Sequence, residues 1–491
     1  MKEKLVIGLD IGTTSVKAVV FNYKGKIHTQ VEELLTTYYP EEGYAEQNPK
    51  EIEMATRVVM KQIFARVDQN KYELVATGIG TAMHSLICVD EEGEALSNMI
   101  IWSDGRASKQ AENLIATTGK EIYARTGTPI HPMTPLLNLI WMRENQFAAY
   151  KKATYFMTMK EYLIYQWFNK RLIDYSMASS TGMFDVKQGI WDDDALQLAG
   201  IKEEQLSEVV EPTTVLSGLC SDLAKELSIP EAHQFIIGSA DGQLANLGSG
   251  ATSKGEVNIS VGTSGAIRQF VDGAPINKKM ETFTYAFTKE TSIIGGPTNN
   301  GGIVLQWLKE LLEYDGDYTE LIEEARDVAV GAEGILFLPY INGERAPLWN
   351  QKAKGNFYGL SIGHKRNQLT RALLEGIAFN IYQISQALEE LAGKSKKITV
   401  NGGLSQSPIW TQILADVFGE DLYLSETHHN AAWGAAWTAL VAIDEAPSFA
   451  AIKENLPAEK KVIANPEAHA EYKEIYERYV NLAEAISPFF D

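Results

Sequence analysis

The hydrophobic pattern at the start of the chain consists of short apolar runs separated by glycine and hydroxyl residues. Two such runs, 5–7 and 18–21, lie on either side of the sequence Asp10-Ile11-Gly12-Thr13-Thr14-Ser15. Short runs of apolar and β-branched residues bounded by turn residues are typical of buried strands. The pattern therefore predicts a strand, a tight turn and a second strand.

The residues that follow complete a layered unit. Residues 27–35 predict a third strand, and residues 74–79 predict a buried strand that ends at Gly80. Between them, residues 49–68 have helical periodicity and begin with Asn48-Pro49, a favourable cap and first-turn pair. Three strands, a helix and a further strand are the opening of a layered α/β domain.

The hairpin pattern of the N-terminus returns about half-way along the chain. Residues 257–267 again run from an apolar segment through Gly262-Thr263-Ser264 to a second apolar segment. Ser260 takes the place that Asp10 has in the first copy, so the carboxylate is not repeated. A hairpin repeated in each half predicts two similar domains that face one another across a cleft.

Regular elements continue to the end of the second half. The pattern predicts strands at 334–340 and 398–400, and helices at 366–392, 407–418 and 431–443, the last of which is expected to be the final helix. Glycine and serine residues break the pattern near 246–255, which predicts a boundary between domains 1–247 and 248–491.

Residues 81–190 form a less regular stretch that is rich in aromatic, methionine, proline and polar side chains. A stretch of this kind between regular elements is where a small-molecule pocket tends to be built. A set of long structural loops is the alternative interpretation.

Composition limits the classes of function. The chain has 491 residues, a formal net charge of -20 and 22% charged residues, so it is a globular protein unsuited to non-specific binding of nucleic acid or an anionic membrane. Two cysteines exclude a disulfide framework. The N-terminus lacks the apolar region of a signal peptide, and no apolar run has the length of a membrane helix. We therefore expect a cytoplasmic protein.

The first hairpin has the residue types of a phosphate site. A backbone can approach an anion closely only where side chains are absent, which Gly12 provides, and Asp10 could hold a hard cation such as Mg²⁺. An ordinary hairpin with polar turn residues is the alternative. The neighbouring histidines His428 and His429 lack the spacing of metal ligands and are expected in a surface loop.

The motifs together resemble the FGGY carbohydrate kinases, which belong to the actin-like, ribonuclease H-like ATPases. The resemblance covers nearly the whole chain in the right order. It implies two α/β domains of ribonuclease H-like fold facing across a catalytic cleft, with ATP and Mg²⁺ as cofactors. The motifs that carry it are 10–15, the run around Asp241, 262–264, Asn401-Gly402-Gly403, the segment Lys160-Glu161-Tyr162-Leu163, and 357–376.

The resemblance assigns roles to individual residues. Asp241 is implied as the catalytic base, a role that spacing alone would not assign, since a plain helix cap is the alternative. Asp10 is expected on the Mg²⁺ side, because a hard divalent cation prefers carboxylate and water oxygens. The residues expected to hold ATP are Gly12, Thr13, Thr14, Ser15, Gly262, Thr263, Gly402 and Gly403.

A second set of residues is expected to bind the sugar. Aromatic faces stack on C–H surfaces, and acidic or histidine side chains bond hydroxyls. Arg106 or His84 could also meet a sugar-acid carboxylate. The set is Met83, His84, Trp102, Asp104, Arg106, Asp241 and Gln243.

Within the family, the segments 82–87 and 126–132 look most like the gluconate kinases. This implies ATP-dependent phosphorylation of a sugar or sugar acid, with D-gluconate giving 6-phospho-D-gluconate as the first choice. Xylulose kinase or another FGGY sugar kinase is the nearest alternative. An actin-like or chaperone-like ATPase that acts through partner binding is a more distant one. The sequence leaves the oligomeric state open, with a homodimer among the options.

Overall fold

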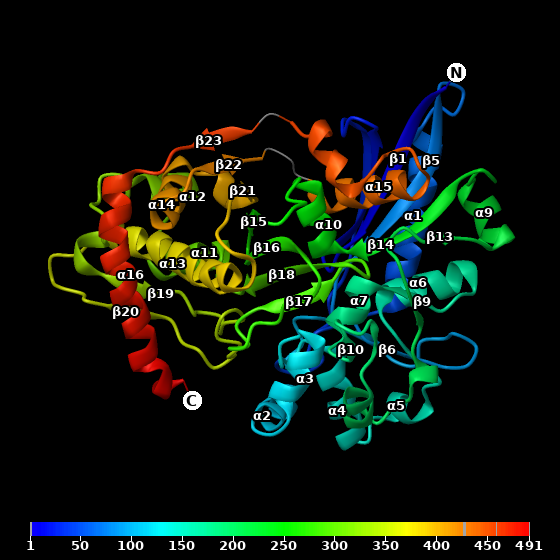
Figure 1. The fold of residues 1–491 in the computed structure, drawn as a ribbon, viewed down its shortest axis with the longest axis horizontal. Helices are drawn as coiled ribbons and strands as arrows, with labels where there is room; N and C mark the ends of the chain where they lie inside the picture. Colours follow the sequence, from blue (N-terminus) through cyan, green and yellow to red (C-terminus); the bar gives the residue numbers. More distant parts are fainter. Residues whose placement is uncertain (1, 426–428, 458, 491) are drawn as a thin grey trace.

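The computed structural model describes residues 2–425, 429–457 and 459–490, and Figure 1 shows two α/β domains side by side. The expectation for His428 lies outside the described residues. The first sheet has six strands in the order β13-β14-β5-β1-β2-β3. These strands are β1 (Glu3–Ile11), β2 (Ser15–Asn22), β3 (Ile27–Leu34), β5 (Tyr72–Thr81), β13 (Val215–Leu216) and β14 (Gln234–Ala240).

The second sheet has seven strands in the order β17-β18-β16-β15-β21-β22-β23. They are β15 (Glu256–Val261), β16 (Gly265–Asp272), β17 (Phe283–Ala286), β18 (Thr291–Thr298), β21 (Lys397–Asn401), β22 (Leu422–Leu424) and β23 (Lys460–Val462).

Five strands of each sheet share one topology. In the order β3-β2-β1-β5-β14, the first two pairs are antiparallel and the next two are parallel. The order β18-β16-β15-β21-β22 has the same directions. The repeated hairpin therefore belongs to a repeated ribonuclease H-like domain, which confirms the predicted fold.

The main predicted helices are present. The side chain of Asn48 accepts a hydrogen bond from the Lys50 backbone N–H at 3.0 Å, which caps the first helix as its sequence predicted. The predicted helices correspond to α1 (Pro49–Arg66), α13 (Arg366–Ala392), α14 (Pro408–Phe418) and α15 (Asn430–Ala442). Helix α10 (Asp241–Gly248) begins at Asp241.

Residues 81–190 contain several short helices that the pattern did not predict, so the alternative interpretation of long structural loops was wrong. These helices are α2 (Ser108–Ile115), α3 (Gly119–Thr126), α4 (Pro135–Glu144), α5 (Ala148–Lys152), α6 (Met159–Phe168) and α7 (Tyr175–Ser180). In α4 and α6 most residues are buried on every side. A helix without a polar face has no visible 3.6-residue period, so the pattern could not reveal it.

The expectation that the helix at 431–443 is the last one was also wrong. A further helix, α16 (Pro466–Ile486), follows it and buries only Ala468, Tyr472, Tyr479 and Ala483. So narrow an apolar stripe gives a weak periodic signal. The pair Asn465-Pro466, in which Asn465 caps the helix, was the available indication.

Short elements complete the chain. The remaining helices are α8 (Asp193–Ala199), α9 (Ser221–Leu227), α11 (Gly302–Leu311) and α12 (Tyr318–Glu323). The remaining strands are β4 (Glu46–Gln47), β6 (Ile87–Val89), β7 (Met99–Ile100), β8 (Tyr155–Met157), β9 (Leu172–Asp174), β10 (Phe184–Asp185), β11 (Ile190–Trp191), β12 (Glu208–Val210), β19 (Leu336–Leu338) and β20 (Asn356–Tyr358). Among the described residues, no helix is both long and apolar enough to span a bilayer.

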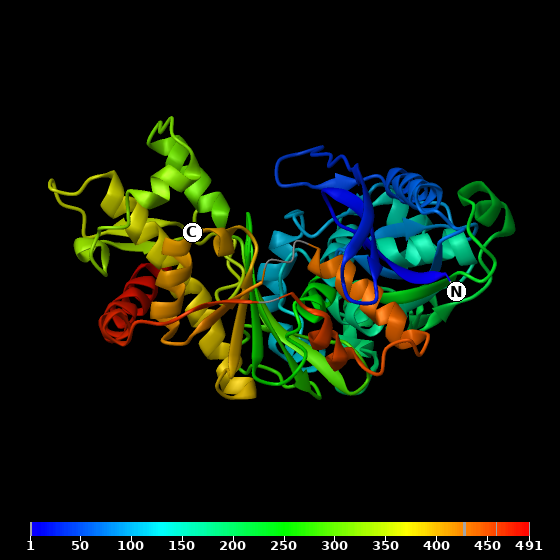
Figure 2. The same ribbon diagram turned by 90° about the horizontal axis from the view of Figure 1, so that it is seen from above.

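Helix α15 belongs to the second half of the sequence but packs on the first sheet (Figure 2). A Cβ atom on Gly8 of β1 would lie 1.8 Å from the carbonyl oxygen of Ala432, and one on Gly78 of β5 would lie 1.9 Å from that of Ala435. Both positions therefore require glycine. Helix α15 therefore covers the sheet of the N-terminal domain although its residues come after the predicted domain boundary at residue 247.

Candidate active site

A cavity of about 370 Å³ lies where the two sheets face one another. Strands β1, β5 and β14 are parallel, so their carboxyl ends meet at one edge, where ligands of open α/β sheets bind. Both halves of the chain contribute to its wall, which includes Thr13, Met83, His84, Trp102, Asp241, Ser260, Gly262, Thr263, Arg268, Tyr285 and Arg345.

Each glycine-containing turn is closed by a backbone hydrogen bond from its glycine, although the two bonds span different numbers of residues. The N–H of Gly12 donates to the Ser15 carbonyl at 3.0 Å, and the N–H of Gly262 donates to the Ser264 carbonyl at 2.9 Å. A Cβ on Gly262 would meet no atom within 4 Å, so this face of the second turn is open. Thr13 and Thr263 thus approach one cavity from opposite domains.

Gly402 and Gly403 lie beside the second turn. Gly402 has φ +83°, and a Cβ there would lie 2.5 Å from the carbonyl oxygen of Val261, so only glycine fits. Neither residue is part of the cavity wall described above. A nucleotide-binding role for this turn stays a prediction.

The start of α11 also supports the second turn, and the sequence interpretation missed it. The N–H of Gly302 donates to the Gly262 carbonyl at 2.7 Å, and the N–H of Ile303 donates to the Thr263 carbonyl at 3.0 Å. The run Asn299-Asn300-Gly301-Gly302 was the signal in the sequence.

Asp241 lines the cavity, and Asp10, which is not part of the cavity wall, lies close enough for the two charges to interact. Burial, followed by the charge of Asp241, raises the pKa of Asp10 to about 7. Burial also raises the pKa of Asp241, while Arg268, the Gly242 N–H and Lys160 oppose that rise. Asp241 accepts a hydrogen bond from the Gly242 N–H at 2.7 Å.

The donor set fits a hard divalent cation. Among the residues that the structure describes, no three His, Cys, Asp or Glu side chains form a complete metal cage. Two mutually repelling carboxylates nevertheless favour a cation between or beside them. Mg²⁺ commonly binds through one or two carboxylates together with water and substrate phosphates, so Asp10 suits a Mg²⁺·nucleotide complex.

His84 is held as a neutral hydrogen-bond acceptor. It has φ +61°, which is uncommon for a bulky residue, and its Nδ1 lies 2.8 Å from the carbonyl oxygen of Ser180. Because a carbonyl only accepts, Nδ1 carries the proton and Nε2 is left as an acceptor. Burial lowers the pKa of His84 to about 4. His84 therefore suits a sugar hydroxyl and not a carboxylate.

Arg345 and Arg268 are cationic residues that the sequence interpretation missed. Burial lowers the pKa of Arg345 to about 10, which still leaves it charged at neutral pH. The Arg345 guanidinium lies 5.1 Å from the ring centroid of Trp102. The Nε atoms of both arginines are buried and make no hydrogen bond to any residue in the described part of the chain.

The loop that carries Arg345 is fixed by Glu344. This fully buried carboxylate accepts hydrogen bonds from Thr298 Oγ1 at 2.7 Å, Asn300 Nδ2 at 3.0 Å and Asn380 Nδ2 at 2.9 Å. It also accepts one from the Asn299 N–H at 3.0 Å. Arg345 is thus held in place before any ligand binds. Its signal in the sequence was a charged pair, Glu344-Arg345, after an apolar strand.

Asp104 and Arg106 do not line the cavity, so the structure does not support the expectation that they bind the sugar. Arg106 donates from Nη2 to Asp104 at 2.8 Å and to Glu46 at 2.7 Å, and its guanidinium lies 4.0 Å from the Tyr44 ring centroid. Asp104 also accepts the Ala45 N–H at 2.6 Å. These side chains neutralise one another within the fold.

Five further predicted site residues lie outside the cavity wall, namely Asp10, Gly12, Thr14, Ser15 and Gln243. Ser15 is buried and its hydroxyl bonds Glu32, while Thr14 is exposed and its carbonyl accepts the Leu35 N–H at 2.9 Å. Gln243 lies buried in the first turn of α10, and its amide makes no hydrogen bond within the described ranges. Roles for these residues stay predictions.

Two ribonuclease H-like domains that bring phosphate-type turns and a carboxylate to one cleft define an actin-like ATPase fold. The N-terminal domain model of the FGGY family of carbohydrate kinases matches residues 5–248, and the C-terminal domain model matches residues 257–443. The chain belongs to the FGGY family of carbohydrate kinases. Family membership across both halves leaves the chaperone-like alternative without support.

Similarity to individual proteins is also high. The chain is 36% identical to gluconokinase of Bacillus subtilis (strain 168), over 97% of this chain and 95% of that protein. It is similar to the crystal structure of gluconate kinase from Lactobacillus acidophilus, with 31% identity, a TM-score of 0.95 and coverage of 98% of each chain. A ligand-bound xylulose kinase from Lactobacillus acidophilus has the same identity and TM-score, over 99% of this chain and 98% of that one.

Proposed function

We propose that this sugar kinase transfers the γ-phosphoryl group of ATP to D-gluconate, giving 6-phospho-D-gluconate. The observation that carries the proposal is the pre-positioned Arg345 on the cavity wall, whose guanidinium lies 5.1 Å from the Trp102 ring centroid and whose buried Nε has no hydrogen-bond partner in the described chain. A guanidinium in such a site suits a carboxylate. The similarity to gluconokinases supports the same substrate.

We propose that the cavity has a sugar-binding end and a phosphate-binding end. His84, Trp102 and Arg345 lie together, because the charge of Arg345 acts on His84 and its guanidinium approaches Trp102. We assign this end to the sugar acid. Thr13 and Gly262 supply hydroxyl and open backbone at the other end, which we assign to the phosphates.

Asp241 is the proposed general base. It lies at the start of α10 on the cavity wall, so it can accept the proton that the attacking hydroxyl loses. Arg268 opposes the rise in its pKa, which favours the carboxylate form needed for this step. When Mg²⁺ is bound at Asp10, it supplies neutralisation of phosphate charge.

The proposal divides the work between the domains. Residues 1–247 provide the base, the first phosphate turn and most sugar contacts. Residues 248–491 provide the second turn, Arg345 and the predicted nucleotide turn at Gly402. Closure of the two domains would exclude water from the reaction.

The proposal is tested by ATP-dependent ADP release against a panel of gluconate, xylulose, glycerol and ribulose. We expect gluconate to give the highest kcat/KM. No ADP release with gluconate, beside activity on another member of the panel, would contradict it.

Xylulose kinase is the second candidate. It is favoured by one observation, the equal structural similarity to a xylulose kinase and a gluconate kinase. Xylulose has no carboxylate, so Arg345 would then contact only hydroxyls. The same panel separates the two candidates.

A further inference from the structure

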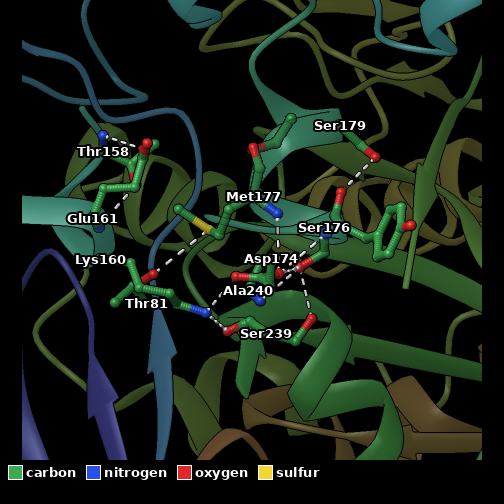
Figure 3. A network of polar contacts seen from close by, with 12 residues as sticks. Thr81, Thr158, Lys160, Glu161, Asp174, Ser176, Met177, Ser179, Ser239 and Ala240 are labelled. Atoms are coloured by element: carbon green, nitrogen blue, oxygen red, sulfur yellow. Dashed lines mark hydrogen bonds and ion pairs between the residues drawn. The ribbon is translucent and has the colours of Figure 1, made fainter. Parts of the chain in front are cut away.

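A buried polar network lies directly behind the proposed base and is not part of the cavity wall. Figure 3 shows Lys160, Asp174 and Ser176 meeting the end of β14 at Ser239 and Ala240. Lys160 and Asp174 are both 0% exposed. A fully buried ion pair is costly unless its remaining donors and acceptors are satisfied, so its bonding pattern shows what it holds in place.

The ion pair is well satisfied. Lys160 Nζ donates to Asp174 Oδ2 at 2.7 Å and to the Ser239 carbonyl at 2.8 Å. Asp174 Oδ1 accepts from Ser176 Oγ at 2.6 Å, from the Ser176 N–H at 3.1 Å and from the Met177 N–H at 3.2 Å. Asp174 thereby caps α7 while it pairs with α6.

The hydrogen-bond directions at Ser176 follow from these contacts. Its single hydroxyl proton is used toward Asp174, so its oxygen can only accept from its other two neighbours. Those neighbours are Ser239 Oγ at 2.6 Å and the Ala240 N–H at 2.8 Å. Ala240 is the residue before Asp241 and the N-cap of α10. Three hydrogen bonds therefore hold the two residues that precede the base.

The other end of α7 reaches the sugar side of the cavity. The carbonyl of Ser180 bonds His84 Nδ1 at 2.8 Å, and Ser179 Oγ accepts the Ala286 N–H of β17 at 3.0 Å. One helix of six residues thus contacts the strand end that precedes the base, the histidine of the sugar end and the second sheet.

We propose that Lys160, Asp174 and Ser176 are positioning residues that fix Asp241 relative to the acceptor hydroxyl. The proposal rests on the proposed function, since it needs Asp241 to be the base. None of the three lines the cavity, so they act through the backbone of Ser239 and Ala240. A small misplacement of a reacting group lowers the rate of the chemical step strongly, whereas the binding of either substrate need not change.

Ser176→Ala is the primary test, because Lys160→Met would leave a buried carboxylate unpaired and endanger folding. With D-gluconate and ATP, we expect kcat to fall about tenfold to a hundredfold, with both KM values within about threefold of wild type. Ser176→Thr, which keeps a hydroxyl, should recover part of kcat. The matched control is Ser385→Ala, which removes a buried helix hydroxyl whose one hydrogen bond among the described residues is to the Tyr382 carbonyl. It should leave kcat unchanged.

A double-variant cycle identifies the route of the effect. If Ser176 acts through Asp241, the loss caused by Ser176→Ala should largely disappear in an Asp241→Asn background. An equal loss in both backgrounds, or an unchanged kcat in Ser176→Ala alone, would overturn the positioning role while leaving Asp241 as base. Near-full activity of Asp241→Asn would instead overturn the base assignment, and the positioning role with it.

Discussion

Asp10 lies near the carboxyl end of β1, and Asp241 directly follows β14, which runs in the same direction in the same sheet. The negative charge of Asp241 adds to burial in raising the pKa of Asp10 to about 7. The pKa of Asp10, in the first hairpin, therefore depends on Asp241, which lies near the end of the N-terminal domain in sequence. Two carboxylates that oppose each other's ionisation create a place where a cation is stabilising.

Replacing Asp10 tests the Mg²⁺ assignment. We expect Asp10→Asn to raise the Mg²⁺ concentration needed for half-maximal activity about tenfold or more, because one charge of the cation's partner is lost. Asp222→Asn removes an exposed carboxylate on α9 and should leave the Mg²⁺ dependence unchanged. Overlapping Mg²⁺ titrations of Asp10→Asn and wild type would count against the assignment.

Replacing Asp241 tests the base. We expect Asp241→Asn to lower kcat by about 10²–10⁴-fold, the usual contribution of a general base, while ATP binding measured by calorimetry stays close to wild type. Retention of near-full gluconate-dependent ADP release would show that another group removes the proton.

Gly8→Ala tests the packing of α15 on the first sheet. The added Cβ would lie 1.8 Å from the Ala432 carbonyl oxygen, so we expect a loss of about 1–3 kcal/mol or more in the free energy of unfolding. At Gly363 the nearest atom to an added Cβ is 3.8 Å away, and Gly363→Ala should unfold like wild type. Equal melting temperatures for both variants would mean that α15 does not sit against Gly8.

The buried, neutral His233 is expected to contribute to the loss of folding stability at acid pH. Its Nδ1 lies 2.8 Å from the Leu74 carbonyl and its Nε2 lies 2.8 Å from Thr77 Oγ1, and burial lowers its pKa to about 4. The unfolded chain binds this proton near pH 6.5, whereas the folded chain does not. The contribution of His233 to the free energy of unfolding is therefore fully present above about pH 6.5. It declines by about 1.4 kcal/mol per pH unit as the pH falls toward 4.

His233→Gln should remove that share of the decline. Denaturant unfolding at about pH 5 and about pH 7.5 should show a smaller loss in the variant than in wild type. A residual slope is expected, because burial also lowers the pKa values of His84 and His131, to about 4 and about 3. An unchanged slope would contradict the neutral, buried state of His233.

The sequence revealed the elements whose patterns are local. The turn at Gly12 and its repeat at Gly262 could be predicted because strand, glycine and hydroxyl residues are consecutive. The long helix α13 could be predicted because its apolar residues recur at helical spacing. These features were enough for the two-domain fold and for one side of the phosphate site.

The rest of the site depends on tertiary contacts that no local pattern contains. Arg106 was a reasonable candidate for a carboxylate until the fold placed it against Asp104 and Glu46. The charged pair Glu344-Arg345 after an apolar strand marked Arg345 in the sequence, but it did not show that the guanidinium would reach the cavity. Its role follows from burial beside Trp102 and from the network that holds Glu344.

The most direct test of the account compares D-gluconate with D-glucitol, which has a hydroxymethyl group in place of the carboxylate, in wild type and Arg345→Met. We expect wild type to favour gluconate in kcat/KM by about 10–100-fold, the range of one hydrogen-bonded charge, and Arg345→Met to lose most of that preference. An unchanged preference in Arg345→Met, or no activity of wild type on gluconate, would contradict the claim that Arg345 selects a sugar acid.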